Sequence, residues 1–212
     1  MVVREETRPD AGARGPAEFR AAVAALRAAT LRPEVFCEEM PAPQRIAPYA
    51  TALSADVTVP VDGTDTDVAT GRLILLHDPD GNDAWAGGTF RLVAYARAEI
   101  DVELITDQML GEVGWSWLTE ALEAHGASYA AVSGTVTRVA TESFGGMSDE
   151  EGSAQIEIRA SWTPVAAGDD AGPVDVRPHA EAWGELLCTA AGLPPVPDGV
   201  TVIPSRRGQR GS

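Results

Sequence analysis

The segment from Phe90 to Leu104 carries an apolar residue at every even position, whereas the odd positions are mostly polar, including Arg91, Tyr95 and Arg97. Successive side chains of a β-strand point to opposite faces of the sheet, so this period of two is typical of a strand with one buried side. The segment predicts an antiparallel sheet in which one face packs on a core and the other face is open and polar.

Four other segments also favour strands. Residues 50–59 and 155–162 alternate in the same way, and residues 129–144 place Ser and Thr on one side. The apolar run within residues 69–77 is typical of a central strand that is buried on both faces. We therefore expect five strands, with the acidic turns VDGTDTD and DPDGNDAWAGG joining the first three.

Three segments have the apolar stripe of an amphipathic helix, one beginning at Pro16 and the others covering residues 106–125 and 178–191. The apolar arc of the second helix widens to about 200° when Trp115 and the small residues Gly111 and Gly114 are included, about twice what contact with one core requires. The sequence therefore predicts an α+β fold with a single, mostly antiparallel five-stranded sheet and helices on one face. The expected order is α-β-β-β-α-β-β-α.

The two ends of the chain differ from its middle. Residues 1–14 and 204–212 are polar, so we expect mobile tails around a single α+β domain at residues 15–203. The N-terminus lacks the apolar stretch of a signal sequence, and no apolar run approaches the roughly 18 residues of a membrane span. A cytoplasmic location with no membrane partner is expected.

The charge of the chain limits its partners and its chemistry. Sixteen basic residues face 32 acidic ones, which gives a formal net charge of −16, so nucleic acid is an unfavourable partner. Every basic residue is Arg. The absence of Lys excludes Schiff-base chemistry, a phosphate-loop lysine and a lysine general base.

The thiols and histidines form no recognisable constellation. Cys37 and Cys188 are isolated, and neither belongs to a CxxC motif. His77, His125 and His179 have no partner at metal-ligand spacing. Structural roles for all five are therefore favoured, and no catalytic, cofactor-binding or metal-binding residue is assigned.

Two acidic segments suggest chemistry that simpler interpretations also explain. Glu99, Asp101 and Glu103 lie on one side of the expected strand and are candidates for paired acid and base carboxylates, or for a solvated strand end. The segment DPDGND has the oxygens of a calcium loop but lacks EF-hand spacing, and its residue types are those that a hairpin turn needs.

The open face of the sheet is the best candidate for a binding surface. Arg91, Tyr95, Arg97 and Arg159 form a mixed polar and aromatic patch there, although an ordinary solvated face has the same composition. An RNA-binding sheet would need several aromatics and a positive net charge. Trp85 and Trp115 are candidate exposed anchors, because Trp concentrates interface energy. The candidate protein-binding surface comprises Trp85, Arg91, Tyr95, Arg97, Trp115 and Arg159.

Two long strings carry a family resemblance. GRLILLHDPDGNDAWAGGTFRLVAYARAEIDVELITDQMLGEVGWSWLTEALE and VRPHAEAWGELLCTAAGLPP resemble an uncharacterised actinobacterial family catalogued as domain of unknown function number 3000. This resemblance implies a lineage and supplies no catalytic residue. The order of elements is also similar to that of secretion-chaperone-like folds, which are small, acidic, cytosolic and usually dimeric.

These observations lead to three hypotheses. The leading one is a non-catalytic, acidic cytosolic protein-binding or chaperone-like protein, forming a homodimer and holding an unidentified protein partner. The alternative is a small enzyme or small-molecule binder with a pocket between sheet and helices, using His179 or the edge formed by Glu99, Asp101 and Glu103. Nucleic-acid binding through the polar face and the basic tail at residues 206–210 ranks last.

Overall fold

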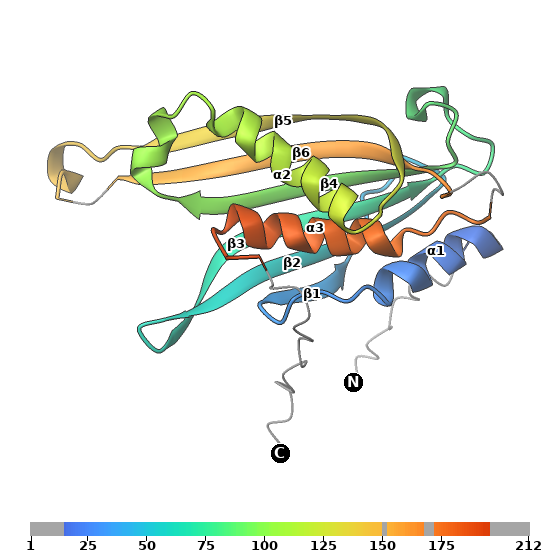
Figure 1. The fold of residues 1–212 in the computed structure, drawn as a ribbon, viewed down its shortest axis with the longest axis horizontal. Coiled ribbons are helices and arrows are strands. Elements are labelled where there is room, and N and C mark those ends of the chain that lie inside the picture. Colours follow the sequence, from blue (N-terminus) through green and yellow to red (C-terminus); the bar gives the residue numbers. More distant parts are fainter. Residues whose placement is uncertain (1–14, 150–151, 168–171, 196–212) are drawn as a thin grey trace, which may run out of the picture.

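A computed structural model describes residues 15–149, 152–167 and 172–195, which form a six-stranded antiparallel sheet with three α-helices on one face (Figure 1). The strands are β1 (Val35–Met40), β2 (Tyr49–Val61), β3 (Thr64–His77), β4 (Phe90–Ile100), β5 (Tyr129–Thr141) and β6 (Ser153–Pro164). The α-helices are α1 (Ala17–Arg27), α2 (Leu110–Ala124) and α3 (Arg177–Ala190), and short 3-10 helices are η2 (Asp83–Trp85), η3 (Val102–Thr106) and η4 (Gly145–Met147).

The strand order across the sheet is β1-β2-β3-β4-β6-β5. All neighbouring strands are antiparallel, so the predicted α+β class and antiparallel sheet are confirmed. The last strand in sequence, β6, lies between β4 and β5, which leaves β1 and β5 as the two edges. The predicted tails at residues 1–14 and 204–212 lie outside the described residues.

The prediction of five strands is wrong, because β1 occupies part of the proline-rich connection before β2. It pairs with residues 52–57 of β2. As an edge strand β1 buries little, and Phe36 on its open side is 66% exposed. The apolar pattern of β1 is therefore weak. Because Pro33 and Pro41 flank the strand, the sequence predicted a loop in its place.

The hairpin between β2 and β3 is tighter than the sequence predicted. Asp62 and Gly63 have φ angles of 51° and 79°, and Val61 pairs directly with Thr64. Two central residues with positive φ make a two-residue turn whose twist matches that of the flanking strands. Strand β3 therefore begins at Thr64 instead of near Ala69.

The strand within the alternating segment from Phe90 to Leu104 is shorter than the alternation predicted, because β4 ends at Ile100. The side chain of Asp101 accepts a hydrogen bond from the backbone N–H of Glu103 at 2.9 Å, which ends β4 and starts η3. Val102 and Leu104 are consequently 48% and 47% exposed, and the second helix begins at Leu110. The expectation that the strand continues to Leu104 is therefore wrong.

The core lies between the sheet and the helices. Helix α3 packs on β3 and β4, and α2 packs on β5 and β6 (Figure 1). Trp162 of β6 and Trp183 of α3 are fully buried. Gly71 allows the close approach of α3, because a Cβ at this position would lie 2.6 Å from a methyl group of Leu187. Within the described residues, no helix has the length and apolarity needed to cross a membrane.

Candidate functional site

The face of the sheet opposite the helices contains a groove of about 790 Å³. Its walls come from β3, β4, β6 and β5. The pairing registers align Arg72, Tyr95, Arg159 and Thr135 in one row across these four strands. Residues far apart in the sequence therefore meet in this groove because the strands are antiparallel neighbours.

Tyr95 stands at the centre of the row. The guanidinium of Arg159 lies 5.1 Å from the centre of its ring, in a cation–π arrangement. The Tyr95 hydroxyl donates a hydrogen bond to Glu157 at 3.3 Å, and Glu157 also forms a 2.7 Å ion pair with Arg159. Burial, followed by the charge of Glu157, raises the pKa of Tyr95, so its hydroxyl stays protonated at neutral pH.

The positive charge of the groove exceeds its negative charge. Arg97 donates to the neutral side-chain amide of Gln155, with the Nε to Oε1 distance at 2.9 Å. Among the described residues, the exposed side chain of Arg72 makes neither a hydrogen bond nor an ion pair. Only Arg159 of these three arginines has a carboxylate partner. The groove is therefore cationic on a chain whose formal net charge is −16.

The remaining lining of the groove is small and mixed. Hydroxyl groups come from Thr70, Ser133, Thr135 and Ser161, and Ile74 and Val93 add apolar surface, as do Ala94, Gly134 and Ala160. Guanidinium and hydroxyl groups bind carboxylates, whereas the apolar strip accepts aliphatic side chains. Among the described residues that line the groove, none is His, Cys, Asp or Glu.

Arg91 does not belong to the exposed surface that the sequence predicted. Its side chain is buried, with 7% of the residue exposed. It donates hydrogen bonds to Ser161 Oγ at 2.7 Å, to the carbonyl oxygen of Ala131 at 3.0 Å and to Thr163 Oγ1 at 3.1 Å. Desolvation lowers its pKa. Arg91 of β4 therefore links its own strand to β6 and to the start of β5, because its guanidinium donates to oxygens from both of these strands.

Trp85 is also buried, at 8% exposed, so its predicted role as an exposed anchor is wrong. The loop before β4 folds back on the sheet, and Thr163 Oγ1 donates to the carbonyl oxygen of Trp85 at 2.9 Å. Within this loop, Asn82 accepts from the N–H of Ala84 at 3.0 Å and Asp78 accepts from the N–H of Asp80 at 3.3 Å. The polar side chains of DPDGND thus stabilise a turn.

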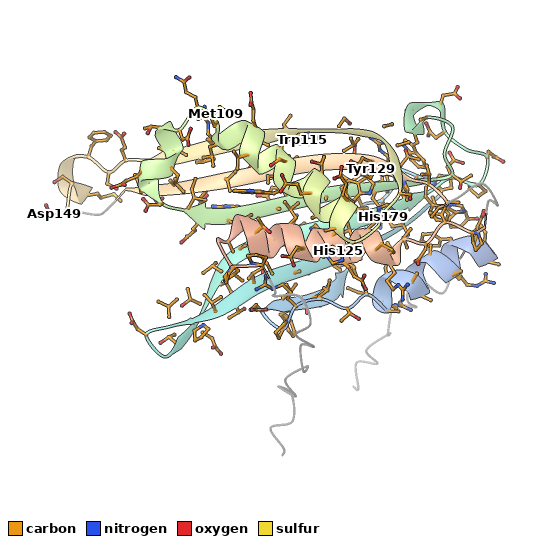
Figure 2. The ribbon with its side chains drawn as sticks, viewed as in Figure 1. Met109, Trp115, His125, Tyr129, Asp149 and His179 are labelled. Atoms are coloured by element: carbon orange, nitrogen blue, oxygen red, sulfur yellow. The ribbon has the colours of Figure 1, made fainter. Side chains whose placement is uncertain are left out.

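Trp115 is half-buried and lies on α2, on the helix-covered side of the sheet (Figure 2). Its ring rests over Gly134 of β5, where an added Cβ would lie 2.7 Å from Cζ3 of the indole. The structure therefore brings Tyr95, Arg97 and Arg159 together and separates Trp115 from them. Sequence reasoning missed Arg72, because the apolar run around it was interpreted as buried on both faces.

His179 is structural in this arrangement. It is buried on α3, and its Nδ1 accepts a hydrogen bond from Nε1 of Trp162 at 3.0 Å. Burial lowers its pKa to about 4, so the imidazole is neutral near pH 7. Its contact with Trp162 lies within the packed core between sheet and helices.

The other two histidines are placed apart from each other and from the groove. His77 is fully buried, and its Nδ1 lies 3.0 Å from the carbonyl oxygen of Thr89. Its ring stacks on Phe90 at a centroid distance of 4.3 Å. Nδ1 of His125, at the end of α2, lies 3.9 Å from a carboxylate oxygen of Glu181. Both histidines join separate elements of the fold.

The two thiols are buried or half-buried, and the acidic edge is divided between two elements. Burial raises the pKa of Cys37 to about 11 and that of Cys188 to about 12, so both thiols stay protonated and are weak nucleophiles. Asp101 and Glu103 leave the strand for η3, which breaks the row with Glu99. In the part of the chain that the structure describes, no three His, Cys, Asp or Glu residues are arranged to hold a metal ion.

A family model described as "Protein of unknown function (DUF3000)" matches residues 15–201. The chain belongs to this family, as its two long sequence strings indicated. No curated protein and no solved structure matches the chain significantly.

Proposed function

We propose that the protein is a non-catalytic, chaperone-like binding protein that holds an acidic, partly apolar segment of a protein partner in the groove on its open sheet face. The observation that carries this proposal is the excess of positive charge from Arg72, Arg97 and Arg159. The chain as a whole has a formal net charge of −16 and repels acidic molecules, so a local cationic groove selects where such a partner docks.

The dimensions of the groove suit an extended peptide. It crosses four strands, which corresponds to roughly 14 Å at the usual spacing between strands. An extended chain covers this width with about four residues. Nucleic acid fits less well, because the groove offers Tyr95 as its one aromatic ring for stacking and the whole chain repels phosphate.

A non-catalytic role agrees with the groups that the groove presents. Guanidinium and hydroxyl groups recognise carboxylates. A hydroxyl group becomes a strong nucleophile when an adjacent base activates it, and the described residues that line the groove include no His, Asp or Glu to do so. Cys37 and Cys188 are free thiols, which fits the reducing cytoplasm that we propose as the location.

A second candidate function is the binding of an apolar small molecule. A hollow of about 350 Å³ lies between η3, α2 and the end of α3 and is lined by Leu104, Leu110, Val113 and Trp117. Its volume is that of a small ligand site, and Glu99 and Asp101 stand in its wall. Native mass spectrometry separates the two candidates, because a retained small molecule would favour this hollow over the groove.

The proposal is tested by affinity capture with charge-reversed variants. The groove variant carries Arg72→Glu and Arg97→Glu, and the control variant carries Arg20→Glu and Arg177→Glu, which change the charge equally on α1 and α3. We expect a protein retained by the wild type and the control to be lost from the groove variant. Equal retention by all three proteins would refute the role of the groove.

A further inference from the structure

The two edges of the sheet differ in how they are protected. Strand β1 has six residues, contains Glu38 and Glu39 and is flanked by prolines. Charges, prolines and short length are the usual devices that prevent an edge strand from pairing with another chain. Strand β5 has 13 residues and contains neither proline nor carboxylate. The edge at β5 therefore carries fewer of these protecting devices than the edge at β1.

The edge at β5 is regular over most of its length. A bulge at Ala131, where φ is 50°, disturbs the start of β5, but residues 133–141 pair with β6 in unbroken register. The one charged side chain of β5 is that of Arg138, which donates to the carbonyl oxygen of Asp107 at 2.7 Å. This hydrogen bond holds the Arg138 guanidinium against the segment between η3 and α2.

We infer that β5 pairs antiparallel with β5 of a second copy of this chain, forming a two-fold symmetric dimer. An antiparallel pair of identical strands is self-complementary, so both copies use the same surface. Two copies of this acidic chain repel each other, and the repulsion is smallest where neither surface carries carboxylates, as along β5. Thr135 and Thr137 lie on the same face of β5, and cross-strand threonine pairs stabilise such a ladder.

The dimer extends the groove and covers the flank of α2. Ser133, Gly134 and Thr135 line the groove and belong to β5, so pairing at this edge brings the two grooves side by side on one continuous sheet. Trp115 lies over Gly134 at the same edge, on the helix-covered side. The second copy therefore also approaches the half-buried Trp115, whose helix has a wider apolar arc than one core needs.

The test places like charges at the paired edge. The edge variant carries Thr137→Lys and Thr141→Lys, two exposed positions of β5 that do not line the groove. The control variant carries Thr64→Lys and Thr66→Lys, which are exposed on β3 and make the same charge change away from this edge. Circular dichroism establishes that each variant is folded.

Light scattering after size exclusion, over a range of protein concentrations, reports the outcome. We expect the wild type and the control to be dimers and the edge variant to dissociate with a dissociation constant roughly tenfold higher or more. A monomeric wild type, or an edge variant as dimeric as the control, would overturn the inference. The groove variant Arg72→Glu and Arg97→Glu should remain dimeric, which separates this inference from the proposed function.

Discussion

Nε1 of Trp162 donates a hydrogen bond to Nδ1 of His179 at 3.0 Å, and both side chains are buried. The bond joins β6 to α3, the helix that covers the middle of the sheet. Because Nδ1 is the acceptor, the imidazole must be neutral with its proton on Nε2. Burial favours the same neutral form and lowers the pKa of His179 to about 4.

The lowered pKa of His179 predicts a loss of stability in mild acid. In the unfolded chain the pKa of this side chain returns to the usual histidine value of about 6.5, so between about pH 6.5 and 4 the unfolded state binds more protons. The contribution of the neutral imidazole is complete above this window and is lost as pH falls through it, by at most about 3 kcal/mol. Urea unfolding at several pH values measures the loss.

A His179→Gln variant should show a smaller drop in unfolding free energy across the same pH window, because the titrating group is gone. The wild type, measured under the same conditions, is the reference for this drop. An unchanged pH dependence in His179→Gln would contradict the assignment of this loss to His179.

Gly134→Ala should destabilise the protein by about 1–3 kcal/mol. The added methyl group would lie 2.2 Å from the carbonyl oxygen of Arg159 and 2.7 Å from the Trp115 ring, and the backbone of β6 cannot move away cheaply. Gly111→Ala, with nothing within 4 Å of the new methyl group, is the control and should cost no stability. Thermal unfolding of both variants tests the packing of α2 on β5.

Arg91→Met should cost about 1–3 kcal/mol, because it leaves buried oxygens of β5 and β6 without a donor. Hydrogen exchange should accelerate most at Ala131 and its neighbours, where the bulge loses its contact with Arg91. Arg97→Met, at an exposed position, should change stability by no more than about 0.5 kcal/mol. Equal effects of the two substitutions would show that Arg91 is not a structural link.

Long stretches with a regular alternation of apolar and polar residues predicted the fold well. The alternation from Phe90 placed β4 with one side buried, and Gly126 ended α2 as expected, with a φ of 66°. Short or half-exposed elements were missed because their signals are weak. Strand β1 buries little of its six residues, and the turn at Asp101 looks like a continuing alternation until its side chain caps η3.

The candidate site was only partly predictable, for a physical reason. Period two places Tyr95, Arg97 and Arg159 on one face, but it does not reveal which strands are neighbours. Arg72 joins this group because β3 pairs with β4. Arg91 lies on the same face of β4 as Tyr95 because both are at odd positions. It is nevertheless buried, and Ser161 and Thr163 of β6 accept hydrogen bonds from its guanidinium.

The binding of acidic peptides by the groove is tested by titrating isotope-labelled protein with a peptide and following the amide chemical shifts. The probe is a short peptide alternating Glu and Val, and its control is a peptide of equal length alternating Lys and Val. We expect the acidic peptide, but not the basic one, to shift the amide signals of Arg72, Tyr95, Arg97 and Arg159 in the wild-type protein. In the variant that carries Arg72→Glu and Arg97→Glu, the acidic peptide should no longer cause these shifts. Shifts confined to the helix-covered side, or an equal response to the basic peptide, would contradict the groove as the binding surface.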